Sequence, residues 1–341
     1  MVTGQSFMML VVLVFTCAFA FLNGFRDASN SIAVAVRNRA LSPTYAVLVA
    51  AFFTFLGTML STTFGVYLIS AVELNVPSGV PGLALLLSAL LAGGSWALYC
   101  WWRGLPVSST HSLVSALAGA GGAAALLGDD GVNNAWRMLA GGVLLPLLFT
   151  PVFAFVVSYV LVIPATWLVR HSTASDVSGG SRAGQAISAC AVALGNGMQD
   201  GQRTGAMLTL ALVTAGAAQP GTIMLGPQLL GATALAAGVL FGGWRIAHTI
   251  AYRLVNLDPL RGMVAQSVSA AMLFVGAMMI HLPISTTQAV TSSIVGAGTN
   301  QRFESVTWRQ VKRVLRHWVA TPVVCALLGG ILCLAMHPLV S

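Results

Sequence analysis

Two stretches of this sequence place an aspartate close to an arginine inside long apolar runs. Residues 23–31 read Asn-Gly-Phe-Arg-Asp-Ala-Ser-Asn-Ser, and residues 195–204 read Gly-Asn-Gly-Met-Gln-Asp-Gly-Gln-Arg-Thr. Ionisable side chains are costly at membrane depth, so their presence there indicates a transport pathway or a binding site. The two aspartates, Asp27 and Asp200, are therefore the first candidates for functional residues.

Asp27 is followed three residues later by Asn30, and this spacing places both side chains on one face of a helix. A carboxylate beside an amide and free backbone carbonyls suits a small hard cation or a proton. This pattern predicts a coupling-ion site that uses Asp27, Asn30 and Asp200. The alternative is an ion pair between Asp27 and Arg26 that only stabilises a break in the helix, but the second aspartate favours the site.

Two clusters of hydroxyl side chains each follow a proline. Residues 106–111 read Pro-Val-Ser-Ser-Thr-His, and residues 283–288 read Pro-Ile-Ser-Thr-Thr-Gln. Proline suits the start of a helix, and the free amides and dipole of a helix N-terminus favour an anion. Ordinary helix capping is the alternative, but two matched clusters favour a shared oxyanion site. Its expected substrate ligands are Ser108, Ser109, Thr110, Ser285, Thr286 and Thr287.

Four further polar residues lie beside these stretches. Arginine is a good bidentate partner for phosphate or sulfate, so Arg203, followed by Thr204, is a further candidate ligand of the anion. Arg26 either contacts the substrate or tunes the charge of Asp27. His111 either relays protons or only makes a hydrogen bond.

The composition is that of a polytopic α-helical membrane protein. Of the 341 residues, 57% are hydrophobic and only 7% are charged, whereas a soluble domain carries about 25% charged residues. Long apolar runs favour helices over a membrane β-barrel, whose segments are short and alternating. The net charge of +8 fits basic cytoplasmic loops. We therefore expect the protein to reside in a lipid bilayer and not to bind nucleic acid.

The sequence offers no sign of ATP chemistry, a tightly bound cofactor or a metal centre. It lacks the GxxxxGK[ST] pattern of a nucleotide-binding loop. Its five cysteines lie in apolar runs without a CxxC pair, which indicates packing and neither a disulfide nor a metal site. We therefore expect an ion-coupled transporter and not an enzyme.

A polar linker, residues 170–184, separates a first transmembrane half, 1–169, from a second, 185–341. The hydroxyl clusters begin at positions 106 and 283 and the aspartates stand at 27 and 200, so both landmarks recur in order at nearly the same interval, which indicates an internal duplication. The expected crossings are 7–36, 44–71, 83–102, 105–127 and 138–169, then 185–217, 222–244, 262–280, 282–298 and 317–336. We expect the first segment of each half to be broken at its aspartate.

About five crossings in each half make the two halves antiparallel. With the N-terminus outside, the inner loops hold almost all basic residues and the outer loops hold only Arg137, in agreement with the positive-inside rule. Inverted repeats with broken helices that meet near the midplane are typical of secondary transporters. We therefore predict an all-α polytopic fold of two inverted repeats, with both termini outside.

The sequence resembles the inorganic phosphate transporter (PiT) family in four motifs that span nearly the whole chain. Residues 23–31 resemble its first signature, residues 200–204 are similar to the counterpart in the second half, and the two proline-led clusters resemble its other repeated signature. Residues 242–245, Gly-Gly-Trp-Arg, are similar to a further family stretch. The resemblance implies symport of inorganic phosphate with H⁺ or Na⁺ by inverted repeats with re-entrant hairpins. It also implies that the aspartates and Asn30 serve the ion and substrate site, with the hydroxyl clusters on the anion.

The chain departs from the family pattern at several positions. Arg26 and Gln199 stand where the family often has asparagine, and Gln288 stands where the second hydroxyl motif usually has histidine. Thr54 and Gln266 align with membrane glutamates of sodium-coupled members. These departures resemble the bacterial branch, which implies proton coupling and phosphate carried as a neutral complex with a divalent metal. Some bacterial relatives carry sulfate.

The lead hypothesis is a phosphate:H⁺ symporter of the bacterial inner membrane that works by alternating access. Its small-molecule partners are inorganic phosphate and the coupling cation. The alternatives are a sulfate or other oxyanion permease, a Na⁺-coupled phosphate symporter and, from a different class, a channel or a non-transporting sensor. The oligomeric state, a homo-oligomer included, stays open.

Overall fold

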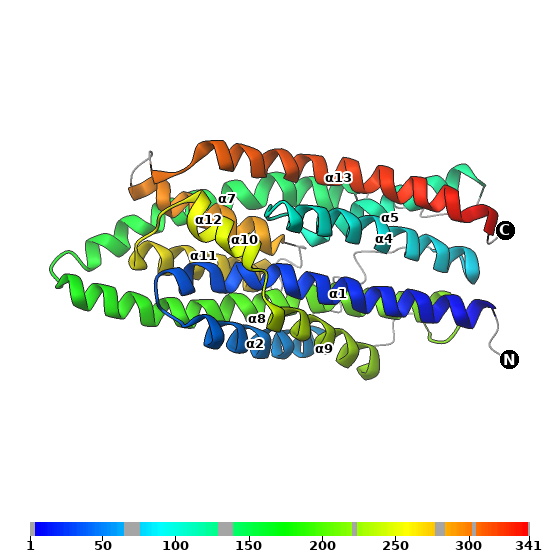
Figure 1. Ribbon diagram of the computed structural model, residues 1–341, viewed down its shortest axis with the longest axis horizontal. Coiled ribbons are helices and arrows are strands. Elements are labelled where there is room, and N and C mark those ends of the chain that lie inside the picture. Colours follow the sequence, from blue (N-terminus) through cyan, green and yellow to red (C-terminus); the bar gives the residue numbers. More distant parts are fainter. Residues whose placement is uncertain are drawn as a thin grey trace.

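The computed structural model describes residues 4–64, 76–128, 139–219, 224–276, 284–301 and 305–339. Within these ranges the regular structure is helical, apart from one isolated antiparallel bridge between Val255 and Val306. The helices lie roughly along one axis and form an elongated bundle (Figure 1). The all-α architecture expected from the sequence is confirmed.

Before residue 170 the chain forms α1 (Gly4–Arg37), α2 (Pro43–Phe64), α4 (Val80–Trp102), α5 (Ser109–Leu126), the π-helical turn η1 (Ala140–Leu144) and α7 (Leu145–Leu168). It then forms α8 (Ala174–Thr214), α9 (Leu225–Phe241), α10 (Trp244–His248), η2 (Thr249–Leu254), α11 (Pro259–Val275), α12 (Thr286–Gln301), α13 (Trp308–Met336) and η5 (His337–Leu339). Five described helices, α1, α2, α4, α7 and α13, are long and apolar enough to cross a membrane. The helix pair on either side of the 55° bend between α9 and α10 gives a sixth if it is one span. The chain is a multi-pass membrane protein.

The first helix of each half is continuous, and the expected break was wrong. α1 passes through residues 23–31 as one helix of 34 residues, and α8 passes through residues 195–204 as one helix of 41 residues. Neither stretch contains a proline. Several of their polar side chains make hydrogen bonds without unwinding the backbone; the Ser29 hydroxyl, for example, donates to the Arg26 carbonyl (2.8 Å).

The third expected crossing, α4, runs alongside α1 in the same direction. A Cβ atom at Gly94 would lie next to the Phe19 ring, and further along both helices Trp101 contacts Phe25, with ring centroids 5.1 Å apart. The end of α4 therefore lies level with the charged stretch of α1, near the middle of the bundle.

The fourth expected crossing is the second arm of a helical hairpin. α5 returns along α4, with Gly93 beside Ser112, so the connecting residues 103–108 lie level with the middle of the bundle. The segment 105–127 begins inside the protein, so it is no full crossing. Non-helical backbone is tolerated there because buried protein groups bond it; the Trp318 indole, for example, donates to the Pro106 carbonyl.

The second half repeats this arrangement with α11 and α12, which pack on each other. α12 begins inside the bundle, where Thr286, Thr287 and Gln288 are all buried. Pro283 lies outside the described residues. Among the described helices, one hairpin stands in place of two expected crossings in each half. The expected number of passes in each half then stays odd, so the argument for antiparallel halves still holds.

In each half, a glycine of the first helix contacts the second helix of the other half. A Cβ atom at Gly24 of α1 would overlap the Leu235 carbonyl of α9, and one at Gly197 of α8 would overlap the Thr54 carbonyl of α2. The interval between the two glycines equals that between the two aspartates. α1 runs from right to left in Figure 1 and α8 from left to right. This is the arrangement that inverted repeats require.

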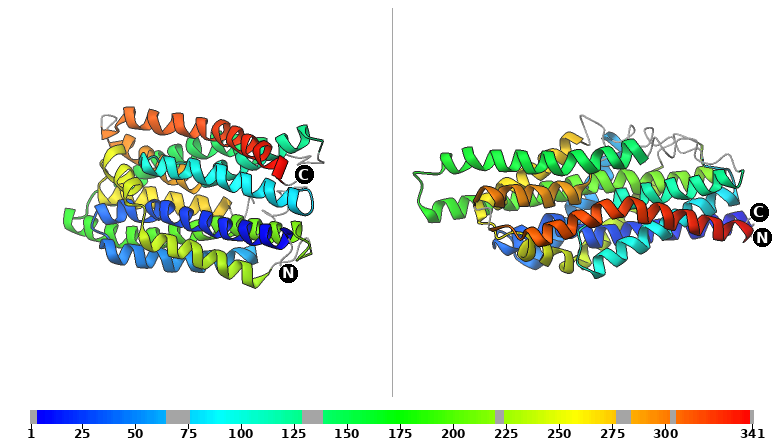
Figure 2. Two further views of the ribbon diagram at one scale, coloured as in Figure 1. Left: turned by 45° about the vertical axis from the view of Figure 1, so that its right-hand side comes forward. Right: turned by 90° about the horizontal axis from the view of Figure 1, so that it is seen from above.

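In the same way, each hairpin contacts the last long helix of the other half through a glycine. Gly119 of α5 lies against the Ala326 carbonyl of α13, and Gly296 of α12 lies against the Phe155 carbonyl of α7. The interval between these glycines equals that between the two hydroxyl clusters. The views of Figure 2 show α13 along α5 and α7 on the opposite hairpin. Each hairpin is therefore covered by a helix from the other half.

The segment expected to be a linker, residues 170–184, is largely helical. Only residues 169–173 separate α7 from α8, and the α7–α8 connection projects at one end of the bundle (Figure 1). The Thr173 hydroxyl caps α8 by accepting from the Asp176 amide (3.3 Å). The segment is rich in glycine and serine but contains no proline. The helix α8 can therefore begin at Ala174, within the expected linker. The division into halves at this segment stays a prediction.

α1 begins and α13 ends at the same end of the bundle (Figure 1). This agrees with an even total number of crossings. That this end faces outward stays a prediction from the distribution of basic residues.

The close approach of α1 and α9 yields a stability test in one helix. A Cβ at Gly238 of α9 would overlap the Phe21 carbonyl, whereas one at Gly226 of the same helix meets nothing within 4 Å. We expect Gly238→Ala to destabilise the protein by about 1–3 kcal/mol through overpacking. Thermal unfolding in detergent measures this, with Gly226→Ala as the matched control. Equal stability of the two variants would contradict the packing.

Candidate functional site

Asp27 lies where α1, α5, α8 and α12 meet. Its side chain is buried, with 5% of the residue exposed. The Ser109 hydroxyl of α5 donates to Asp27 Oδ2 (3.5 Å), and the Thr287 hydroxyl of α12 donates to Asp27 Oδ1 (3.4 Å). Each carboxylate oxygen thus faces a hydroxyl from a different hairpin, and the structure brings both predicted clusters to the first aspartate.

Asn30 belongs to the same group of contacts. Its side-chain amide donates to the Thr287 hydroxyl (3.4 Å), which in turn donates to Asp27. We call Asp27, Asn30 and Thr287 the first half-site. It combines one carboxylate with two neutral oxygen-bearing side chains.

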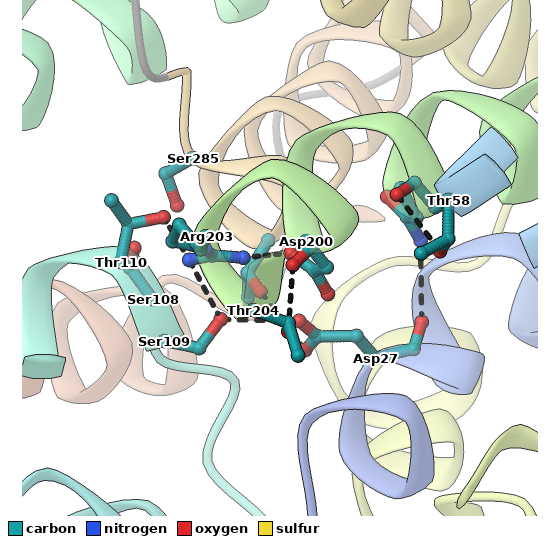
Figure 3. Close-up of polar contacts among 12 residues, drawn as sticks. Asp27, Thr58, Ser108, Ser109, Thr110, Asp200, Arg203, Thr204 and Ser285 are labelled. Atoms are coloured by element: carbon teal, nitrogen blue, oxygen red, sulfur yellow. Dashed lines mark hydrogen bonds and ion pairs between the residues drawn. The ribbon is translucent and has the colours of Figure 1, made fainter. Parts of the chain in front are cut away.

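Asp200 lies in the equivalent group of the second half. Arg203 forms an ion pair with Asp200 through Nη2, and its Nη1 donates to the hydroxyls of Ser109 (3.2 Å) and Thr110. Figure 3 shows the guanidinium between the aspartate and the two α5 hydroxyls. We call Asp200, Arg203 and Thr110 the second half-site. Ser109 joins the two half-sites, because it accepts from Arg203 and donates to Asp27.

The hydroxyls of Ser108 and Ser285 act as helix caps. Ser108 accepts from the His111 amide (3.2 Å), and Ser285 accepts from the Gln288 amide (3.3 Å). For these two serines the structure shows the capping interaction. Capping fixes the first turns of α5 and α12. Ser109, one position after Ser108, and Thr287, two positions after Ser285, then donate to Asp27.

Three further predicted residues, Thr204, Thr286 and His111, are buried. The Thr204 hydroxyl donates to the Asp200 carbonyl of its own helix (2.9 Å), although the residue lies close to Asp200 in Figure 3. Thr286 is buried in the first turn of α12. The His111 ring is buried, and its Nε2 has no hydrogen-bond partner among the described residues. The relay role of His111 stays a prediction.

Arg26 is fully buried and holds the first hairpin. Its Nη2 donates to the carbonyl of Val107 (2.7 Å), in the connection between α4 and α5. The ion pairs in the described part of the chain are Asp200–Arg203 and Asp258–Arg261. The alternative of an Asp27–Arg26 ion pair is therefore not what the structure shows, and Arg26 positions the residue before Ser108.

Sequence reasoning did not single out Asn196, which belongs to the site. Its amide donates to the Asp27 carbonyl (3.5 Å) and links α8 to α1. Its counterpart in the first half is Asn23, which is also buried and stands four positions before Asp27, as Asn196 does before Asp200. The alignment of the two aspartates could have identified this pair.

The comparison with family models assigns both halves. The model of the phosphate transporter family matches residues 23–178 and again residues 169–329. The chain belongs to the phosphate transporter family. The resemblance stated from the four motifs is thereby confirmed. Each family match contains one of the two site aspartates, Asp27 or Asp200, and one hydroxyl cluster.

Two curated relatives are similar over nearly their whole length. A probable low-affinity inorganic phosphate transporter of Bacillus subtilis is 34% identical over 328 residues, which cover 95% of this chain and 96% of the relative. A protein of the same description from Rhizobium meliloti is 33% identical, with 96% of each chain covered. The solved structure of a sodium-dependent phosphate transporter superposes with a TM-score of 0.82 at 21% identity, covering 97% of this chain and 99% of that one. This likeness supports the fold.

The hydrogen bond from Arg26 to the Val107 carbonyl should slow local opening of the turn in the first hairpin. A hydrogen bond from a charged group contributes about 1.5–3 kcal/mol, so Arg26→Gln should speed amide hydrogen exchange in residues 103–108 by about tenfold or more. Mass-spectrometric exchange of the detergent-solubilised protein measures this, with the exposed Arg39 changed to Gln as the control. Unchanged exchange in Arg26→Gln would remove Arg26 from the positioning of the hairpin.

Proposed function

We propose that this protein is a secondary active transporter that takes up inorganic phosphate together with a cation. The observation that carries the proposal is the meeting of two helix N-termini, from α5 and α12, at one buried carboxylate. An anion and a cation can then be bound next to each other at membrane depth. The names of the full-length relatives support phosphate as the anion.

The anion site we propose lies at the first turns of α5 and α12. The first amides of a helix have no partner within the helix, and the helix dipole favours negative charge there. Ser109, Thr110 and Thr287 add hydroxyl donors, and Arg203 adds a positive charge beside them. The proposed set of substrate-binding residues is completed by Ser108, Ser285, Thr286 and Thr204.

The cation site we propose centres on the two aspartates and Asn30. Carboxylate, amide and hydroxyl oxygens suit both Na⁺ and a proton. The resemblance to the bacterial branch favours protons, and Na⁺ coupling is the alternative. His111 and Arg26 complete the proposal, His111 as a candidate proton relay and Arg26 as the residue that sets the position of the first hairpin.

We place the protein in the bacterial inner membrane with both termini outside, because the basic loops then face the cytoplasm. The two halves, 1–169 and 185–341, act as inverted repeats in alternating access. The cargo is phosphate alone or its neutral complex with a divalent metal, and uptake with and without Mg²⁺ separates the two.

Sulfate is the second candidate substrate, because a helix N-terminus and an arginine bind either tetrahedral oxyanion. Uptake of labelled phosphate and of labelled sulfate, each competed by the other, distinguishes them. Dependence on Na⁺ together with insensitivity to an uncoupler would replace protons by Na⁺ as the coupling ion. Uptake against a gradient excludes a channel and a sensor.

The central test is uptake of labelled phosphate into proteoliposomes against its gradient. We expect Asp27→Asn to abolish accumulation, because the amide cannot supply the charge that binds the cation. Asp176→Asn changes an exposed carboxylate at the start of α8 and serves as the control. Normal accumulation by Asp27→Asn, or none by the unchanged protein, would contradict the proposal.

The second test removes one hydroxyl without changing the side-chain volume much. Thr287→Val deletes the group that bonds both Asp27 and Asn30, so we expect the cation concentration for half-maximal uptake to rise about tenfold, the equivalent of about 1.4 kcal/mol. Thr299→Val is the control on the same helix, since its hydroxyl bonds the Val295 carbonyl (2.8 Å), away from the aspartate. An equal response of both variants would count against the first half-site.

A further inference from the structure

The two half-sites are built alike and differ in one residue. Asp27 corresponds to Asp200, and Thr110 corresponds to Thr287, at the intervals that relate the two halves. Asn30, three positions after Asp27, corresponds to Arg203, three positions after Asp200. A neutral amide in one half-site is therefore replaced by a guanidinium in the other.

Both side chains reach the equivalent hydroxyl. Asn30 donates to Thr287, and Arg203 donates to Thr110. In the first half-site the hydroxyl donates directly to the carboxylate (3.4 Å). In the second, the guanidinium lies between them, paired with Asp200 on one side and with Thr110 on the other (Figure 3).

The charge of the two half-sites differs as a result. Asp200 is only 2% exposed, and Arg203 neutralises it within the protein. Asp27 is 5% exposed, and its direct partners from the hairpins are neutral hydroxyls. A buried carboxylate without a direct ion pair is costly. Arg203 forms such a pair with Asp200, whereas Arg26, the buried cation next to Asp27 in the chain, donates to the Val107 carbonyl instead. The first half-site is therefore the one that can take a cation from solution in direct contact with its carboxylate.

We propose that Arg203 is a tethered cation, which fills in the second half-site the position that a mobile coupling cation takes in the first. The guanidinium stays with the protein through the transport cycle and is not released. One mobile cation, bound at Asp27, then accompanies each phosphate. This inference rests on the proposed function, and it reduces the role of Asp200 from binding a mobile ion to holding Arg203.

Arg203 also connects the two half-sites. Its Nη1 donates to Ser109 (3.2 Å), whose hydroxyl donates to Asp27 Oδ2 (3.5 Å). The tethered charge is thus one hydroxyl away from the carboxylate that takes the mobile cation. Like charges repel, so this short path disfavours a second mobile cation beside the first.

The test measures how many cations move with each phosphate. The purified full chain is reconstituted in proteoliposomes with labelled phosphate on both sides and the membrane potential held at zero. The cation gradient that stops net phosphate flux is then found, once with Na⁺ and once with protons. A phosphate gradient of about tenfold is balanced by a cation gradient of about tenfold when one cation is coupled, and by about threefold when two are.

We expect one cation per phosphate for the unchanged protein and two for Arg203→Asn, which gives the second half-site the composition of the first. Arg203→Lys keeps the tethered charge and should keep a ratio of one. The double variant Asp200→Asn with Arg203→Asn removes both charges and should also give one. These three ratios separate the charge of Arg203 from its size.

Two results would overturn the proposal. One is a ratio of two in the unchanged protein, which decides the matter even if no variant reaches the membrane. The other is a ratio of one in an Arg203→Asn protein that still accumulates phosphate. Failure of the proposed function has a different signature, because the unchanged protein would then not accumulate phosphate under any cation gradient.

Discussion

The structure depends on the cost of burying two carboxylates where water cannot hydrate them. Asp27 and Asp200 lie deep in a bundle of apolar helices, and each must be given donors by the protein or a cation from solution. The donors come from the first turns of α5 and α12 and from Arg203. The position of both hairpins is thus fixed by the charge that they have to stabilise.

The non-helical backbone in the interior follows from the same requirement. A helix can present hydroxyls and free amides to a buried site only if it starts there, and this places the turn that precedes it inside the membrane. Such backbone is tolerated where protein groups bond it. Arg26 and Trp318 do so for the carbonyls of Val107 and Pro106. Because Ser108 and Ser109 begin α5 inside the bundle, the Val107 carbonyl before them needs a donor, and Arg26 supplies it.

Much of this arrangement could be predicted from the sequence, because charge in an apolar run and repeated polar motifs are local signals. The family was inferred correctly, and the structure brings the hydroxyl clusters to Asp27 as the motifs had suggested. The continuity of α1 was not foreseen although residues 23–31 contain no proline. The role of Arg26 was not foreseen because it depends on a partner far along the chain. Val107 is 81 residues away from Arg26, and composition does not reveal whether a distant carbonyl will satisfy a buried arginine. From composition, the turn at residues 103–108 was interpreted as the start of a new crossing because a hairpin arm has the apolar composition of a span. The family resemblance, by contrast, implied re-entrant hairpins.

The crossed packing of the last helices has a consequence for the origin of the fold. α13 covers the hairpin of the first half through Gly119, and α7 covers that of the second half through Gly296. A chain of one half would leave its hairpin uncovered on that side and its aspartate facing no second hydroxyl cluster. Such a chain could complete itself only with another copy inserted in the opposite direction. If the duplicated gene descended from a single half, that ancestor worked as an antiparallel dimer with both orientations in one membrane.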